Sequence, residues 1–252
     1  MISYYLGITL LSIVQGISEF IPVSSSAHLI ILSKLGKLSS QSLEIDISLH
    51  LGSLLAIITY FKKDLFLIFK NKILFNLILF GSLPIVLVGS ILYFFEIIYI
   101  LRNIEIIAWS TLIFGILLFF ADKKKEERQI EKELTLNRIF VIGTFQILAL
   151  IPGVSRSGIT ITAGRLIKFN RVDCAKISFF LSIPALTAAC ILGLKDFTDV
   201  DNYFNKTIIL STLLSFFFSY LTIKFLLIYL KKFSLNVFVF YRIILSFVLF
   251  FI

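Results

Sequence analysis

Six long apolar runs decide what this sequence can fold into. Each is roughly 18 to 24 residues long, enough for a helix to cross the hydrocarbon core of a bilayer. They cover residues 43–61, 73–95, 104–121, 172–194, 207–230 and 235–252. Only 15% of the residues are charged, whereas a soluble domain usually carries about 25%. The sequence therefore predicts an all-α integral membrane protein, a single membrane domain over residues 1–252 with about six transmembrane helices, and excludes a soluble helical bundle.

The segments between these runs alternate in their content of lysine and arginine. Lysine-rich segments follow the first, third and fifth runs, at residues 62–72, 122–138 and 231–232. The connections 96–103 and 195–206 are poorer in basic residues. Because cytoplasmic loops carry the excess of basic residues, the lysine-rich segments are predicted to be cytoplasmic. This topology explains the net charge of +9, so we expect no nucleic-acid partner.

The sequence indicates neither a cleaved secretory signal nor a cysteine-based metal site or disulfide framework. The first basic residue is Lys34, so the charged start of a cleaved secretory signal is not evident. The two cysteines, Cys174 and Cys190, lie in apolar sequence without the spacing of a metal site or a disulfide framework. We expect both to be packing residues.

Two further apolar segments are too short to cross. Residues 2–14 supply about 13 residues, a rise of about 20 Å, before a polar stretch that begins at Gln15. Residues 139–151 end in the same way, at the sequence PGVSRSG that begins at Pro152. Irregular polar backbone is tolerated at membrane depth only inside protein or beside a wet cavity. We therefore predict two re-entrant helical hairpins, each with a break between two half-helices.

An internal repeat relates the two hairpins. At an offset of about 130 residues, QGISEFIPVSSSAH from Gln15 aligns with QILALIPGVSRSG from Gln146, and ISLHLGSLLA from Ile47 aligns with ISFFLSIPAL from Ile177. This predicts repeat one over about 1–121, a cytoplasmic loop over about 122–138 and repeat two over about 139–252. Three crossings separate equivalent points, so the repeats should be inverted, with the functional site where the two breaks meet.

The first break holds a compact set of polar residues. Gln15 and Glu19 are four residues apart and share one helical face. Pro22 disfavours helical geometry in the residue before it. The serines that follow, at positions 24, 25 and 26, suit the N-cap of the returning half-helix, and His28 lies on its first turn.

The second break adds a cation to a similar pattern. Gly153 and Gly158 permit tight turns, Ser155 and Ser157 supply hydroxyls, and Arg156 offers a planar fork suited to phosphate. Free N–H groups and the helix dipole favour an anion at each break. A purely structural Glu19–Arg156 ion pair is the alternative. His50 and Asp46, four apart in the first crossing, are left outside the predicted site.

These motifs resemble a known family. The pattern Gln15-x-x-x-Glu19, the following PVSSSAH, the distant PGVSRSG and the LGSLLA from Leu51 are similar to the signature motifs of the undecaprenyl-diphosphate phosphatases, also called bacitracin-resistance proteins (BacA or UppP). The likeness covers essentially the whole chain. Position 15 is often Glu in that family and is Gln15 here, so Glu19 is the only carboxylate within the two motifs.

The resemblance implies a specific activity. Family members hydrolyse undecaprenyl diphosphate to the monophosphate, which recycles the lipid carrier for peptidoglycan synthesis and protects cells against bacitracin. It also implies a divalent cation, magnesium or calcium, and a site open to the periplasmic or outer side of the bacterial inner membrane. Two rival functions remain. One is a polyprenyl-phosphate flippase, because inverted repeats are typical of transporters. The other is a non-catalytic assembly protein of the membrane.

The predicted roles follow from the residue types. Arg156 and the half-helix N-termini bind the diphosphate, and Glu19 positions a metal ion or acts as a base. His28 activates the nucleophile or protonates the leaving oxygen. Ser25 is the candidate nucleophile, with water and His28 as alternatives. The expected substrate-binding residues are Gln15, Ser24, Ser26, Gly153, Ser155, Ser157 and Gly158. The oligomeric state is open, and a homodimer is compatible with the sequence.

Overall fold

In the computed structural model, the described residues 2–35, 43–101, 103–194 and 202–251 form helices and short connections, with no β-strand among them. The helices are α1 (Ile2–Ser18), α2 (Ser25–Leu35), α3 (Leu43–Tyr60), α4 (Lys62–Lys70), α5 (Lys72–Phe94), α6 (Ile97–Ile100), α7 (Ile104–Asp122), α8 (Ile130–Glu133), α9 (Leu136–Gln146), the 3₁₀ helix η1 (Ile147–Leu150), α10 (Arg156–Leu166), α11 (Arg171–Leu194), α12 (Asn202–Leu230) and α13 (Asn236–Phe250). The predicted all-α fold is confirmed. Residues 102 and 195–201 of the predicted lysine-poor connections lie outside the described residues.

The six predicted crossings coincide with α3, α5, α7, α11, α12 and α13. Among the described residues, four helices are long and apolar enough to cross a membrane, at Lys72–Phe94, Ile104–Asp122, Arg171–Gly193 and Lys206–Leu230. The apolar parts of α3 and α13 are shorter. The structure is thus that of a helical membrane protein, and six crossings remain a prediction.

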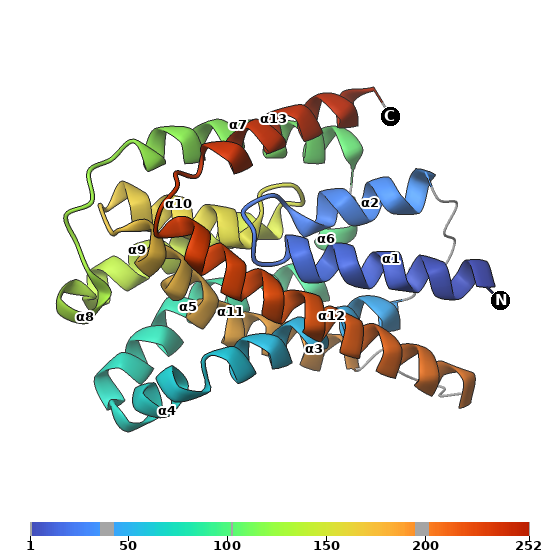
Figure 1. The fold of residues 1–252 in the computed structure, drawn as a ribbon, viewed down its shortest axis with the longest axis horizontal. Coiled ribbons are helices and arrows are strands. Elements are labelled where there is room, and N and C mark those ends of the chain that lie inside the picture. The colour runs from blue at the N-terminus through green and yellow to red at the C-terminus, as the bar shows by residue number, and fades with distance from the viewer. Residues whose placement is uncertain (1, 36–42, 102, 195–201, 252) are drawn as a thin grey trace.

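Both breaks form tight turns between two helices. The first lies between α1 and α2 and the second between η1 and α10. Each turn ends in a serine with positive φ, Ser24 at 75° and Ser155 at 69°, which redirects the chain into the returning helix. Figure 1 shows the two turns beside each other near the middle of the molecule. The inverted relation of the two halves remains a prediction.

Close contacts between helices hold the bundle together. The helix α5 packs on α9, and a Cβ added at Gly143 would lie 2.0 Å from the carbonyl oxygen of Gly81. The helix α3 packs on α12, where Ser48 and Ser211 share a 2.6 Å hydrogen bond. Small residues permit such approaches between membrane helices. Cys174 and Cys190 lie buried as free thiols.

The lysine-rich segments gather at one end of the molecule. Figure 1 places α4, α8 and the turn between α12 and α13 at the end opposite the two termini. The segment 122–138 contains α8 and is tied to α10 by the buried Arg165, which lies 3.4 Å from the carboxylate of Asp122. The amphipathic helix α4 was not predicted; it exposes Phe66 and Phe69 beside its lysines.

Candidate active site

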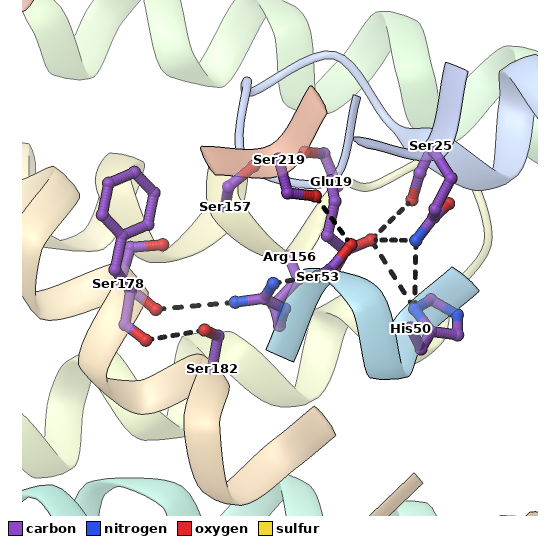
Figure 2. A network of polar contacts seen from close by, with 12 residues as sticks. Glu19, Ser25, His50, Ser53, Arg156, Ser157, Ser178, Ser182 and Ser219 are labelled. Carbon is purple, nitrogen blue, oxygen red and sulfur yellow. Dashed lines mark hydrogen bonds and ion pairs between the residues drawn. The ribbon is translucent and has the colours of Figure 1, made fainter. Parts of the chain in front are cut away.

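An ion pair joins the two breaks. The Nη2 atom of Arg156 donates a hydrogen bond of 2.7 Å to Oε1 of Glu19 (Figure 2). Glu19 follows the end of α1 and Arg156 begins α10, so each lies where a helix is interrupted. Their side chains are only 6% and 12% exposed. The structure thus brings Glu19 and Arg156 together, as the sequence analysis expected, and joins them in the buried ion pair that it gave as the structural alternative.

The second oxygen of the Glu19 carboxylate is bound from two sides. Nε2 of Gln15 donates to Oε2 of Glu19 at 2.8 Å, from one turn earlier on α1. The hydroxyl of Ser25, the first residue of α2, donates to the same oxygen at 3.2 Å. A carboxylate that accepts from Ser25 is placed to take up its proton. This geometry suits an activated serine.

His50 belongs to this cluster, which corrects its exclusion from the predicted site. Nε2 of Gln15 lies 3.0 Å from Nδ1 of His50, and this Nδ1 lies 3.9 Å from Oε2 of Glu19. Because the amide nitrogen can only donate, Nδ1 of His50 is the acceptor and the proton of the neutral ring lies on Nε2. Asp46 borders the same cavity. The sequence did contain a signal for His50 and Asp46. Two ionisable residues four positions apart in an apolar run are expected to face the interior of the bundle.

A cavity of about 440 Å³ opens beside the ion pair, within the usual range of ligand sites. Its polar end is lined by Gln15, Glu19, Ser24, Ser25, Ser26, His50, Ser155 and Arg156. Its remaining wall is largely apolar and comes mainly from α5 and α11, with residues such as Ile85, Val86, Ala185 and Leu186. Such a cavity can take a ligand with a charged head and an apolar tail.

Three predicted substrate-binding residues instead make structural contacts, two of them between the breaks and one within the second break. Ser157 is fully buried and donates to the carbonyl of Ile21 at 3.0 Å. The N–H of Gly153 donates to Ser26 at 3.2 Å, and the N–H of Gly158 donates to its N-cap, Ser155, at 3.2 Å. Ser157, Gly153 and Gly158 are not part of the cavity lining, whereas the predicted Gln15, Ser24, Ser26 and Ser155 are.

His28 does not line the cavity that contains the ion pair. Its Nδ1 lies 2.6 Å from the carbonyl oxygen of Ser24, and its Nε2 lies 2.5 Å from the hydroxyl of Tyr241 on α13. A carbonyl only accepts, so Nδ1 carries the proton and the neutral ring accepts from Tyr241 through Nε2. The ring is not among the residues that line the cavity. His28 therefore supports the turn before Ser25 in this conformation, and does not contact the predicted reaction centre.

Arg242 on α13 was missed by the sequence interpretation. Its side chain is fully buried, and it donates to backbone carbonyls in both breaks. A basic residue at the centre of a membrane helix costs roughly 2.5–3.5 kcal/mol on insertion scales. Because this cost is tolerated only where the residue has partners in the protein, the sequence could have indicated that Arg242 has a role inside the bundle.

The oxygen atoms near Glu19 are of the kind that bind divalent cations. The amide Oε1 of Gln15 is buried and has no hydrogen-bond partner among the described residues, and the carboxylates of Glu19 and Asp46 border the same cavity. Magnesium and calcium prefer such oxygens. The described residues contain no group of three or more His, Cys, Asp or Glu that could hold a metal ion. A cation here would therefore need further ligands from substrate or water.

Comparisons with known proteins find relatives over almost the whole chain. The family model described as bacitracin resistance protein BacA matches residues 8–248. An undecaprenyl-diphosphatase of Pelagibacter ubique is 53% identical over 100% of this chain and 99% of its own. Undecaprenyl-diphosphatases of Elusimicrobium minutum and Saccharophagus degradans are 40% and 39% identical, each over 94% of this chain and 93% of its own. The chain thus belongs to the BacA family of bacitracin resistance proteins.

Proposed function

We propose that this protein hydrolyses undecaprenyl diphosphate to undecaprenyl phosphate and inorganic phosphate. The observation that carries the proposal is the buried Arg156–Glu19 pair with the Ser25 hydroxyl on the same carboxylate. The names of the similar proteins support the same reaction. The product would return to peptidoglycan synthesis, and the activity would confer resistance to bacitracin.

The diphosphate would bind at the polar end of the cavity. Arg156 presents a fork of five N–H donors, and one of its nitrogens is engaged by Glu19. The residue also begins α10, where free backbone N–H groups and the helix dipole favour an anion. These groups would neutralise the transferring phosphoryl group, which is the main catalytic requirement of this chemistry.

Ser25 is the proposed nucleophile. Its oxygen would form a bond to the terminal phosphorus while the bond from that phosphorus to the bridging oxygen breaks, and its proton would pass to Glu19. Glu19 then passes this proton to the former bridging oxygen of the leaving undecaprenyl phosphate and is again a carboxylate. Water then cleaves the phosphoserine, which restores the serine hydroxyl and releases phosphate. Direct attack by water activated by Glu19 is the alternative.

A divalent cation would complete the polar end. Glu19 is its proposed ligand. The amide oxygen of Gln15 and the carboxylate of Asp46 border the same cavity and could contribute. When bound, the cation would offset the negative charge of the diphosphate. The apolar wall formed by α5 and α11 would take the first part of the isoprenoid tail.

The protein is proposed to lie in the bacterial inner membrane with its site reached from the periplasmic or outer side. The gathering of lysine-rich segments at one end supports this orientation, because that end would be cytoplasmic. A homodimer stays compatible with these features.

Phosphate release in detergent tests the function. Purified protein should release one phosphate per undecaprenyl diphosphate, and a chelator should lower the rate, with recovery on adding magnesium or calcium. A flippase would release none, because flipping leaves the diphosphate intact. Absence of phosphate release by folded wild-type protein, with and without cations, would contradict the proposal.

A further inference from the structure

One buried cation contacts both breaks at once. Arg242 is fully buried on α13, and its three guanidinium nitrogens donate to four backbone carbonyls. The acceptors belong to three segments of the chain: Thr111 on α7 at 3.1 Å, Pro22 in the first break at 3.4 Å, and Val154 and Gly153 in the second break at 2.8 and 3.1 Å. In the described part of the chain, no carboxylate is paired with this guanidinium.

We propose that Arg242 is a positioning residue, which fixes the two breaks against each other and so keeps Arg156 beside Glu19 and Ser25. This inference rests on the proposed function. The carbonyls that it binds are separated from the reacting groups by only two or three positions, since Pro22 precedes Ser25 by three residues and Val154 precedes Arg156 by two. A shift of either carbonyl therefore moves the group that performs the chemistry.

The arrangement needs the shape of an arginine. Nε, Nη1 and Nη2 of Arg242 each donate in a different direction, whereas lysine concentrates its three donors on one nitrogen. Space for the fork is provided by Gly158, because a Cβ at that position would lie 2.9 Å from Nη1 of Arg242. Lysine at position 242 would keep the charge but leave carbonyls in one break or the other without a donor.

A second buried arginine provides a matched control. Arg165 is also fully buried and also donates to backbone carbonyls, those of Phe169, Asp122 and Lys124. It differs in having a carboxylate partner, Asp122, and in binding no carbonyl of either break. Loss of its fork should weaken packing without moving the reaction centre.

The experiment compares Arg242→Lys with Arg165→Lys in the full-length protein in detergent. We would measure kcat and KM on undecaprenyl diphosphate, the thermal midpoint, and hydrogen exchange of residues 20–27 and 151–158. Arg242→Lys should lower kcat at least tenfold, change KM by less than about threefold, and speed exchange in both breaks. Arg165→Lys should lower the thermal midpoint and keep kcat, per folded molecule, within about twofold of wild type.

Equal kcat and equal exchange in wild type and Arg242→Lys would overturn the inference, as would a loss of kcat that merely follows the folded fraction. If wild type releases no phosphate, the proposed function fails, and the exchange data alone decide about Arg242. If Arg242→Lys does not fold, Ser157→Ala takes its place, because the Ser157 hydroxyl also ties α10 to the first break at Ile21. That variant should lower kcat about threefold or more with faster exchange, and unchanged values of both would overturn the inference.

Discussion

The guanidinium of Arg156 donates a 2.7 Å hydrogen bond to the carboxylate of Glu19, although 137 positions separate the two residues in the chain. Among the hydrogen bonds described above that join the first break directly to the second, this one is the shortest. The roles of both partners, and of the groups around them, can be separated by substitution.

Replacing Arg156 by alanine should lower kcat by about 10²–10³-fold, the usual effect of removing one donor that stabilises the charge of a transition state. Arg156→Lys should recover part of the rate, because it keeps the charge but loses the planar fork. Phosphate release at saturating undecaprenyl diphosphate measures both effects, with the thermal midpoint as the control for folding. Full turnover by folded Arg156→Ala would refute the assigned role.

Ser25 and Ser26 provide a matched pair for the nucleophile. Ser25→Ala should lower the rate of phosphate release more than about 10³-fold if the serine oxygen attacks the phosphorus. Ser26→Ala should lower it far less, since Ser26 accepts a hydrogen bond from the N–H of Gly153. Mass spectrometry after rapid acid quench should find phosphate on Ser25 in wild-type protein. An active Ser25→Ala enzyme would transfer the role of nucleophile to water.

The contact between His28 and Tyr241 separates two roles for the histidine. If His28 only supports the turn through the carbonyl of Ser24, Tyr241→Phe should keep kcat within about threefold of the wild-type value. His28→Gln should then lower kcat modestly. If the ring leaves Tyr241 to transfer a proton, His28→Gln should flatten one limb of the pH–rate profile. The structure leads us to expect the first result. If one limb of the plot of kcat against pH is lost in His28→Gln, His28 transfers a proton directly.

Gly143 should be required for stability. A Cβ there would lie 2.0 Å from the carbonyl oxygen of Gly81, and backbone cannot move aside as a side chain can. Gly143→Ala is expected to destabilise the fold by about 1–3 kcal/mol, the usual cost of overpacking, which a lower thermal midpoint in detergent would register. The control is Gly89→Ala, where the nearest atom is the flexible end of Leu150 at 3.3 Å. Similar midpoints for the two variants would argue against the close contact of α5 with α9.

Much of the helical framework could be predicted from local sequence. Apolar runs of bilayer length form helices wherever they occur, and α5 and α7 lie within one residue of the predicted spans. The start of α5 is further fixed by the N-cap Asn71, which accepts from the N–H groups of Ile73 and Leu74. The pairing of Glu19 with Arg156 was also accessible, because the aligned motifs pointed to a common site.

Contacts that depend on side-chain direction could not be predicted in this way. His28 is held by Tyr241, 213 positions later in the chain, and no local pattern reveals that partner. Ser157 has the residue type expected for phosphate binding, yet it is used to join the breaks. The helix α4 was absorbed into a lysine-rich connection, since its short apolar face falls well below bilayer length.

The carbonyl cluster around Arg242 also bears on the order in which the protein is assembled. The residue lies on α13, the last helix in the described chain, whereas the carbonyls that it binds come from residues 22, 111, 153 and 154. While the chain is still being synthesised, both hairpins can enter the bilayer before their shared donor has left the ribosome. The four hydrogen bonds of Arg242 can therefore form only when α13 inserts, and until then the two breaks are joined by their direct contacts alone.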